Sequence, residues 1–87
     1  MSLQIMLVFL TFVLMVQVRD KELISKIAQR LKALREEKGL TQEQLYNDLE
    51  IHVGRIESMK VNPTVSTINS LCKYFEISLA EFFDGIH

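Results

Sequence analysis

The sequence has little of what metal sites, disulfides and catalysis require. Its one cysteine, Cys72, cannot form an internal disulfide, which fits a reducing compartment such as the cytoplasm. The only histidines, His52 and His87, form no Cys/His pair at metal-ligand spacing, so we expect no metal. Because the chain also lacks a glycine-rich phosphate loop, an activated nucleophile and a suitably placed carboxylate pair, we expect neither an enzyme nor a cofactor.

Glycine, proline and net charge are scarce as well. Three glycines and one proline in 87 residues, with 48% apolar residues, are typical of one packed domain and exclude a fibrous or disordered chain. A net charge of −1 gives no overall attraction to nucleic acid, so any DNA binding has to come from a local pattern. A chain this short buries only about 60% of its unfolded surface, so we expect a second subunit to stabilise it.

The uncharged stretch 3–18 is almost entirely apolar and ends at Arg19, so we divide the chain into an N-terminal segment, 1–18, and a domain, 19–87. As a helix, 3–18 would span roughly 24 Å, short of the ~30 Å hydrocarbon core of a bilayer. It has no basic start and no small-residue cleavage site, which argues against a secretion signal.

Three interpretations of the segment remain. Its β-branched and aromatic residues, apolar on both alternating faces, favour a strand that pairs with the same strand of a second subunit. A membrane-associated segment is the second interpretation. The third is that translation starts at Met15 and the upstream residues are not native.

From Asp20 onward, apolar residues recur at helical spacing. Asp20 is a plausible N-cap and Gly39 a plausible C-terminal stop for a helix over about 20–38. Thr41 begins a second helix that runs to about residue 48. The apolar stripe of the first helix comprises Ile24, Ile27, Ala28, Leu31 and Leu34.

Three more helices complete the domain. A short one contains Val53 and Ile56 and ends before Pro63. The next begins at Thr64 or Ser66 and carries the stripe Ile68, Leu71, Cys72 and Phe75. Ser78, with Glu81 three residues later, forms a capping box for the last helix. We therefore predict an all-α domain of five helices.

Four runs of sequence, 34–45, 55–57, 62–68 and 75–83, together resemble the Xre/Cro-type helix-turn-helix family of phage and bacterial repressors. The resemblance covers about residues 23–84. It implies a five-helix domain in which the second helix contacts the DNA backbone and the third enters the major groove of double-stranded DNA.

The resemblance also implies candidate DNA contacts. Thr41 and Gln42 stand where a helix N-terminus and a side-chain amide meet a phosphate. Arg55 offers a two-pronged contact to guanine or a contact to phosphate. The remaining candidates flank Arg55 and are His52, Ser58, Lys60 and Asn62.

Arg35 and Glu57 lie at the buried edges of the first and third helices. A guanidinium and a carboxylate in these places indicate a structural ion pair, which the similar family also has. We assign both residues to the fold and not to base reading.

The sequence departs from the family pattern around the third helix. Between Leu45 and Ile56 it is about three residues shorter than usual, somewhat less than one helical turn. Glu50 and Met59 stand in place of glycines and disfavour positive φ, so we expect the local geometry to differ. Tyr46 replaces a small alanine, which demands extra room between helices. Asp48 and Glu50 add negative charge near the DNA face.

We therefore expect a cytoplasmic, bacterial-type transcriptional regulator that binds specific DNA as a homodimer, with residues 3–18 as the candidate dimer contact. One alternative is a protein-interaction module, antitoxin-like or an adaptor, whose DNA face has degenerated. A membrane-tethered regulator is the other.

Overall fold

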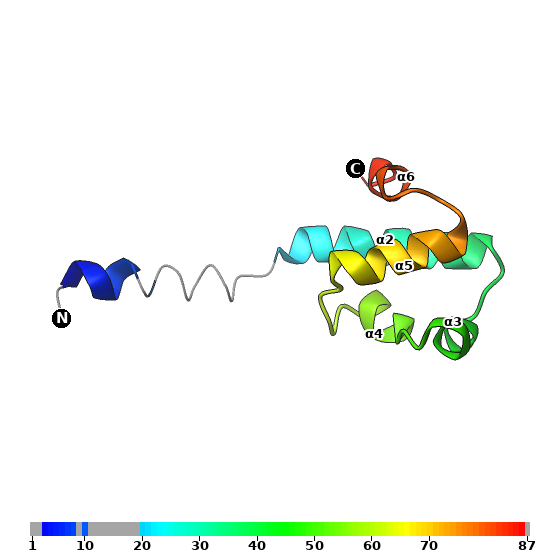
Figure 1. Cartoon of the computed structure of the whole chain (residues 1–87), viewed down its shortest axis with the longest axis horizontal. Helices are drawn as coiled ribbons and strands as arrows, with labels where there is room; N and C mark the ends of the chain where they lie inside the picture. The colour runs from blue at the N-terminus through cyan, green and yellow to red at the C-terminus, as the bar shows by residue number, and fades with distance from the viewer. Residues whose placement is uncertain (1–2, 9, 11–19, 87) are drawn as a thin grey trace.

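The computed structural model describes residues 3–8, 10 and 20–86, and this part of the chain contains helices and no strand. Between residues 20 and 86 there are five helices, as predicted (Figure 1). Their bounds are α2 Lys21–Glu37, α3 Gln42–Leu49, α4 Val53–Glu57, α5 Val65–Phe75 and α6 Leu79–Asp84.

Short polar side chains fix where these helices begin. The Asp20 carboxylate accepts a hydrogen bond of 2.9 Å from the Leu23 N–H at the start of α2. Thr41 and Ser78 form capping boxes at α3 and α6. Thr64, not Ser66, caps α5. Gly39, at φ +69°, follows α2 in the left-handed conformation that a helix stop favours.

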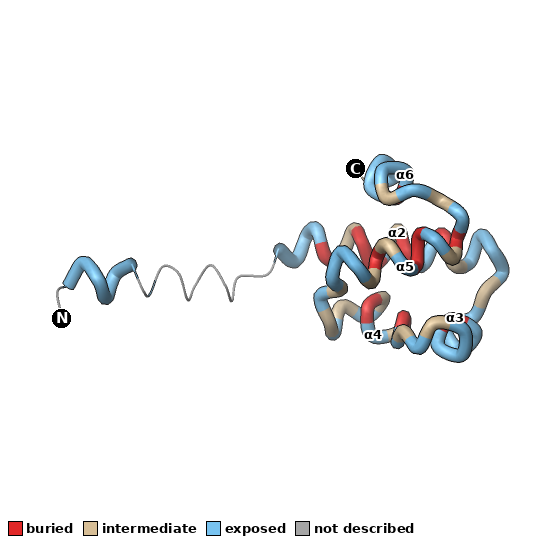
Figure 2. Tube along the Cα trace, viewed as in Figure 1, coloured by how far each residue is buried: buried red, intermediate tan, exposed pale blue. Residues whose placement is uncertain are grey.

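All five helices contribute to the core, and α2 and α5 supply seven of its eleven residues (Figure 2). In Figure 1, α3 and α4 lie on one side of α2 and α5, and α6 lies on the other. Each fully buried side chain contributes roughly 1.5–3 kcal/mol. The core cluster comprises Ile27, Leu31, Leu34, Leu45, Val53, Ile56, Ile68, Leu71, Cys72, Phe75 and Phe82.

Arg30 of α2 holds the C-terminal end of α6. Its Nε donates to the Phe82 carbonyl and its Nη2 to the Glu81 carbonyl, both at 3.0 Å. The guanidinium carbon also lies 6.0 Å from the centre of the buried Phe82 ring. A Cβ atom at Gly85 would come within 2.3 Å of that carbon, so glycine allows this close approach. A cation at the carbonyl end of a helix is favourable, and Arg30 is thereby committed to the fold.

Two residues that stand where the family pattern has glycine adopt positive φ. Glu50 and Met59 adopt φ +58° and +63°, so the expectation of a different local geometry is wrong for these residues. The left-handed conformation costs about 1–2 kcal/mol per residue. Hydrogen bonds support both turns, from the Glu50 N–H to the Tyr46 carbonyl and from the Lys60 N–H to the Arg55 carbonyl.

The strand interpretation of the N-terminal segment is also wrong where it can be compared, because residues 3–8 and 10 are helical. A helix satisfies its backbone hydrogen bonds within one chain, whereas a strand needs a partner strand. Residues 9 and 11–18 lie outside the described residues. Among the residues that the structure describes, no helix combines the length and apolarity needed to cross a bilayer.

The strain at Glu50 leads to a test of stability. Glu50→Gly should raise the free energy of unfolding by about 1 kcal/mol, because glycine adopts positive φ without steric cost. Glu43→Gly, which removes the same charge from a helical position, should lower it by about 1 kcal/mol. Urea unfolding of the two variants measures both effects, and a Glu50→Gly loss as large as the Glu43→Gly loss would contradict the account.

Candidate nucleic-acid interface

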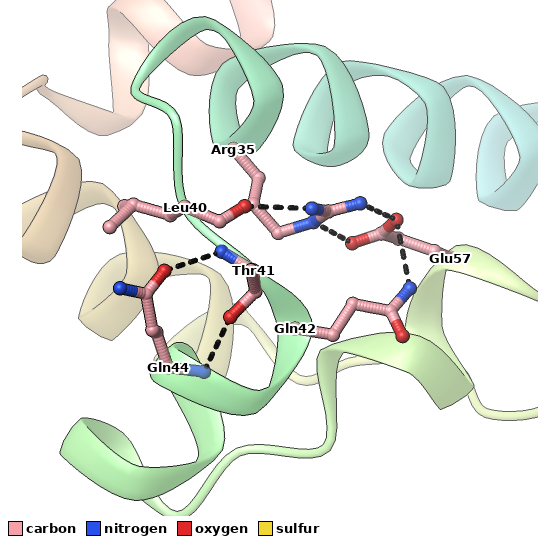
Figure 3. A network of polar contacts seen from close by, with 6 residues as sticks. All are labelled: Arg35, Leu40, Thr41, Gln42, Gln44 and Glu57. Carbon is pink, nitrogen blue, oxygen red and sulfur yellow. Dashed lines mark hydrogen bonds and ion pairs between the residues drawn. The ribbon is translucent and has the colours of Figure 1, made fainter.

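An ion pair joins α2 to α4. Together with a hydrogen bond to the loop before α3, it positions α3 and α4, the two helices on either side of the sharp turn at residues 50–52. Arg35 Nε donates to Glu57 Oε2 at 2.8 Å, and Arg35 Nη2 donates to Glu57 Oε1 at 2.9 Å (Figure 3). The third guanidinium nitrogen, Nη1, donates to the Leu40 carbonyl at 2.8 Å. One side chain of α2 therefore holds both α4 and the loop that leads into α3.

The pair is largely shielded from water. The side chains of Arg35 and Glu57 are 11% and 6% exposed. The hydrogen-bonded Glu57 carboxylate raises the pKa of Arg35 above its ordinary value, although burial acts in the opposite direction. Two parallel, charge-assisted hydrogen bonds fix orientation as well as distance, so the pair sets the direction of α4.

Gln42, the first residue of α3, extends this network. Its Nε2 donates to Glu57 Oε1 at 3.3 Å. A Cβ atom at Gly54 would lie only 2.8 Å from Gln42 Oε1, so glycine lets the first turn of α3 lie against α4. The neighbouring Thr41 is occupied as the cap, because its Oγ1 accepts from the Gln44 N–H at 3.1 Å.

An open groove of about 490 Å³ lies between α3 and α4, and we call it the α3/α4 groove. It brings together five of the seven residues that the sequence marks as candidate DNA contacts. Its lining comprises Gln42, Glu43, Tyr46, His52, Val53, Gly54, Arg55, Ser58 and Lys60.

A second hollow of about 330 Å³, the α4/α5 groove, adjoins α4. Asn62, a sixth candidate contact, lines it with Pro63 and Thr64. His52 and Arg55 line both grooves and thus form an exposed ridge between them. Thr41, the seventh candidate, lines neither groove.

Charges of both signs surround this ridge. Arg55 and Lys60 face the α3/α4 groove together with Glu43, which sequence reasoning overlooked. Glu50 lines the α4/α5 groove, as its expected position near the candidate face implied. Asp48 is engaged elsewhere, because its carboxylate accepts a hydrogen bond from the Tyr74 hydroxyl of α5. That hydrogen bond raises the pKa of Tyr74.

Tyr46 is a second residue that sequence reasoning did not place at the site. Its side chain is 43% exposed and lines the α3/α4 groove, and the extra room that its size was expected to demand between the helices stays a prediction. Its ring stacks on His52, with 4.4 Å between ring centres and 27° between ring planes. No group of three or more His, Cys, Asp or Glu side chains in the described part of the chain is placed to hold a metal ion.

The helices α3 and α4 are joined by a sharp turn and held on a small helical core, and α4 is exposed between two grooves. This arrangement defines a helix-turn-helix domain. The comparison with known families agrees, because a family model described as helix-turn-helix matches residues 31–82, more than half of the chain. The chain therefore belongs to the Xre/Cro-like helix-turn-helix family of DNA-binding regulatory domains. No curated protein and no solved structure matched the chain in the corresponding searches.

The ion pair gives the second stability test. Arg35→Ala leaves the Glu57 carboxylate shielded from water without its main partner, so the free energy of unfolding should fall by about 3–5 kcal/mol. Arg35→Leu and Glu57→Leu each break the pair as well, whereas the double variant removes both charges and should cost less than the sum of these two single leucine changes. With the wild type, these three variants form the four corners of a double-mutant cycle. Chemical unfolding of the four proteins completes the cycle, and strictly additive losses would show that the residues act independently.

Proposed function

We propose that the chain is a sequence-specific transcriptional regulator that binds double-stranded DNA as a homodimer, with α4 in the major groove. The observation that supports this most is the ridge of His52 and Arg55, which is exposed between two grooves at the start of α4, a helix whose direction the shielded ion pair fixes. We place this activity in a bacterial cytoplasm, where a single buried cysteine, Cys72, stays reduced.

The candidate contacts divide by chemistry. Arg55 presents a planar fork suited to the O6 and N7 acceptors of guanine, and His52 lies beside it. Lys60, Ser58 and Asn62 follow α4 and reach toward phosphates.

Gln42 and Thr41 stand at the N-terminal end of α3. A primary amide has two N–H groups, so Gln42 keeps one for a phosphate while the other binds Glu57. Free backbone N–H groups and the helix dipole at this end also favour an anion.

The shortness of α4 supports a dimer. With only five residues, α4 offers few positions for base contact in each subunit. Two linked copies double these contacts and raise the affinity by orders of magnitude without any new kind of contact. We propose that the N-terminal segment joins the copies, since its helical residues Leu3, Met6, Val8 and Leu10 expose apolar side chains.

Selection of binding sites from a random duplex pool tests the function directly. The full chain should enrich a two-fold-related motif whose half-sites lie about one helical turn apart. Binding should weaken strongly between ~50 and ~200 mM salt, because phosphate contacts release counterions. A pool that shows no enrichment at either salt would overturn the proposal and leave an interaction module.

Arg55 and Lys60 should affect DNA binding differently. Arg55→Ala should reduce the ratio of affinities for the preferred and the other base pairs at one position of the half-site about tenfold or more, because a base contact is lost. Lys60→Ala should weaken binding to all duplexes alike and reduce the salt slope by about one. Lys73→Ala removes an exposed cation of α5 that lines neither groove, and it serves as the matched control. Titrations by fluorescence anisotropy measure all three, and a Lys73→Ala effect equal to that of Lys60→Ala would refute the assignment of this face.

Two charges in the N-terminal segment test the dimer. Met6→Glu with Leu10→Glu places carboxylates four residues apart on one face of the helix, where burial against a second copy is costly. The dimer dissociation constant should rise at least tenfold, which corresponds to about 1.4 kcal/mol. Sedimentation equilibrium measures it. The melting temperature of the domain should change little, because all core residues lie beyond residue 23. A dimer of unchanged stability would place the interface elsewhere.

A further inference from the structure

The contacts between α3 and α4 follow a regular register. Gln42 lies against Gly54. One turn further along α3, Tyr46 stacks on His52, which precedes Gly54 by two residues. Gln42 and Tyr46 are four residues apart and therefore share one face of α3. Both residues are exposed; the Gln42 contact lies next to the ion pair, and the Tyr46 contact lies one helical turn away from it.

The Tyr46 contact lies at the groove that the proposed function assigns to DNA. Tyr46, His52 and Arg55 all line the α3/α4 groove. Tyr46 is 43% exposed and is absent from the core cluster. His52 precedes α4 at its N-cap position but makes no side-chain cap hydrogen bond. The stacked rings are thus held against each other at the mouth of the groove, beside the Arg55 fork.

We propose that Tyr46 is a specificity-determining residue for DNA, forming with His52 an aromatic platform that reads a thymine methyl group in the major groove. This inference rests on the proposed function. The C5-methyl of thymine is the one apolar group that a base pair presents in the major groove, and apolar side-chain atoms are its natural contacts. Stacking on His52 restricts both rings before DNA arrives, so little rotamer freedom is lost on contact.

A purely structural role for the ring pair gives different results. If Tyr46 only held α4 in place, its removal would lower the melting temperature and weaken binding to every duplex by the same factor. A base-reading role changes the preference at one base pair and leaves the salt slope unchanged, because no phosphate contact is lost.

The test uses the full chain with the motif selected from the random pool, and with duplexes in which each thymine in turn is replaced by deoxyuridine. For the wild-type protein, removal of one particular methyl group should weaken binding about fourfold, the effect of burying one carbon group. Tyr46→Ala should bind the thymine and deoxyuridine duplexes equally, whereas Tyr46→Phe, which keeps the ring, should retain the difference. Asn47→Ala changes the next, equally exposed residue of α3, which lines neither groove, and should behave as wild type.

The outcomes separate the inference from the function it rests on. The platform is refuted and the regulator stands if the wild-type chain selects a motif but binds every deoxyuridine duplex as tightly as the thymine duplex. The conclusion is the same if Tyr46→Ala keeps the wild-type dependence on the methyl group. The same holds if Tyr46→Ala weakens all duplexes equally in step with a lower melting temperature. If the wild-type chain selects no motif, both proposals fail.

Discussion

The paired hydrogen bonds between Arg35 and Glu57 are the interaction on which the rest of the site depends. Because both side chains are shielded from water and the fork fixes orientation, α4 has one direction relative to α2. The same guanidinium holds the loop before α3 through the Leu40 carbonyl, and Glu57 accepts from Gln42 at the start of α3. Besides their core residues Leu45, Val53 and Ile56, α3 and α4 are thereby held by one charged group of α2.

A short α4 leaves a small reading surface, and the chain compensates in specific ways. The backbone adopts the left-handed conformation at Glu50 and Met59 despite their side chains, so the turns before and after α4 keep positive φ. Tyr46 stacks on His52 beside the groove and adds ring surface next to Arg55. Carboxylates line both grooves beside the basic side chains. Under the proposed function, they limit non-specific attraction to DNA, and a second copy of the domain adds affinity.

The sequence predicts what local spacing determines. The caps at Asp20, Thr41 and Ser78 act through hydrogen bonds across three residues, so their pattern is visible in the chain, and the core stripes of α2 and α5 follow from helical periodicity. Contacts between distant residues leave no such pattern. The docking of Arg30 on the end of α6, the stacking of Tyr46 on His52 and the helical conformation of residues 3–8 all depend on neighbours or energies that spacing does not encode.

The most direct test of the account is a nuclear magnetic resonance titration of the isotope-labelled full chain with the selected duplex. The account predicts that the largest shift changes fall on residues of the two grooves, with His52 and Arg55 foremost, while Arg30 and the α6 residues that it holds stay unchanged. Shift changes centred on α6 and the first turns of α2, with the grooves unaffected, would contradict it.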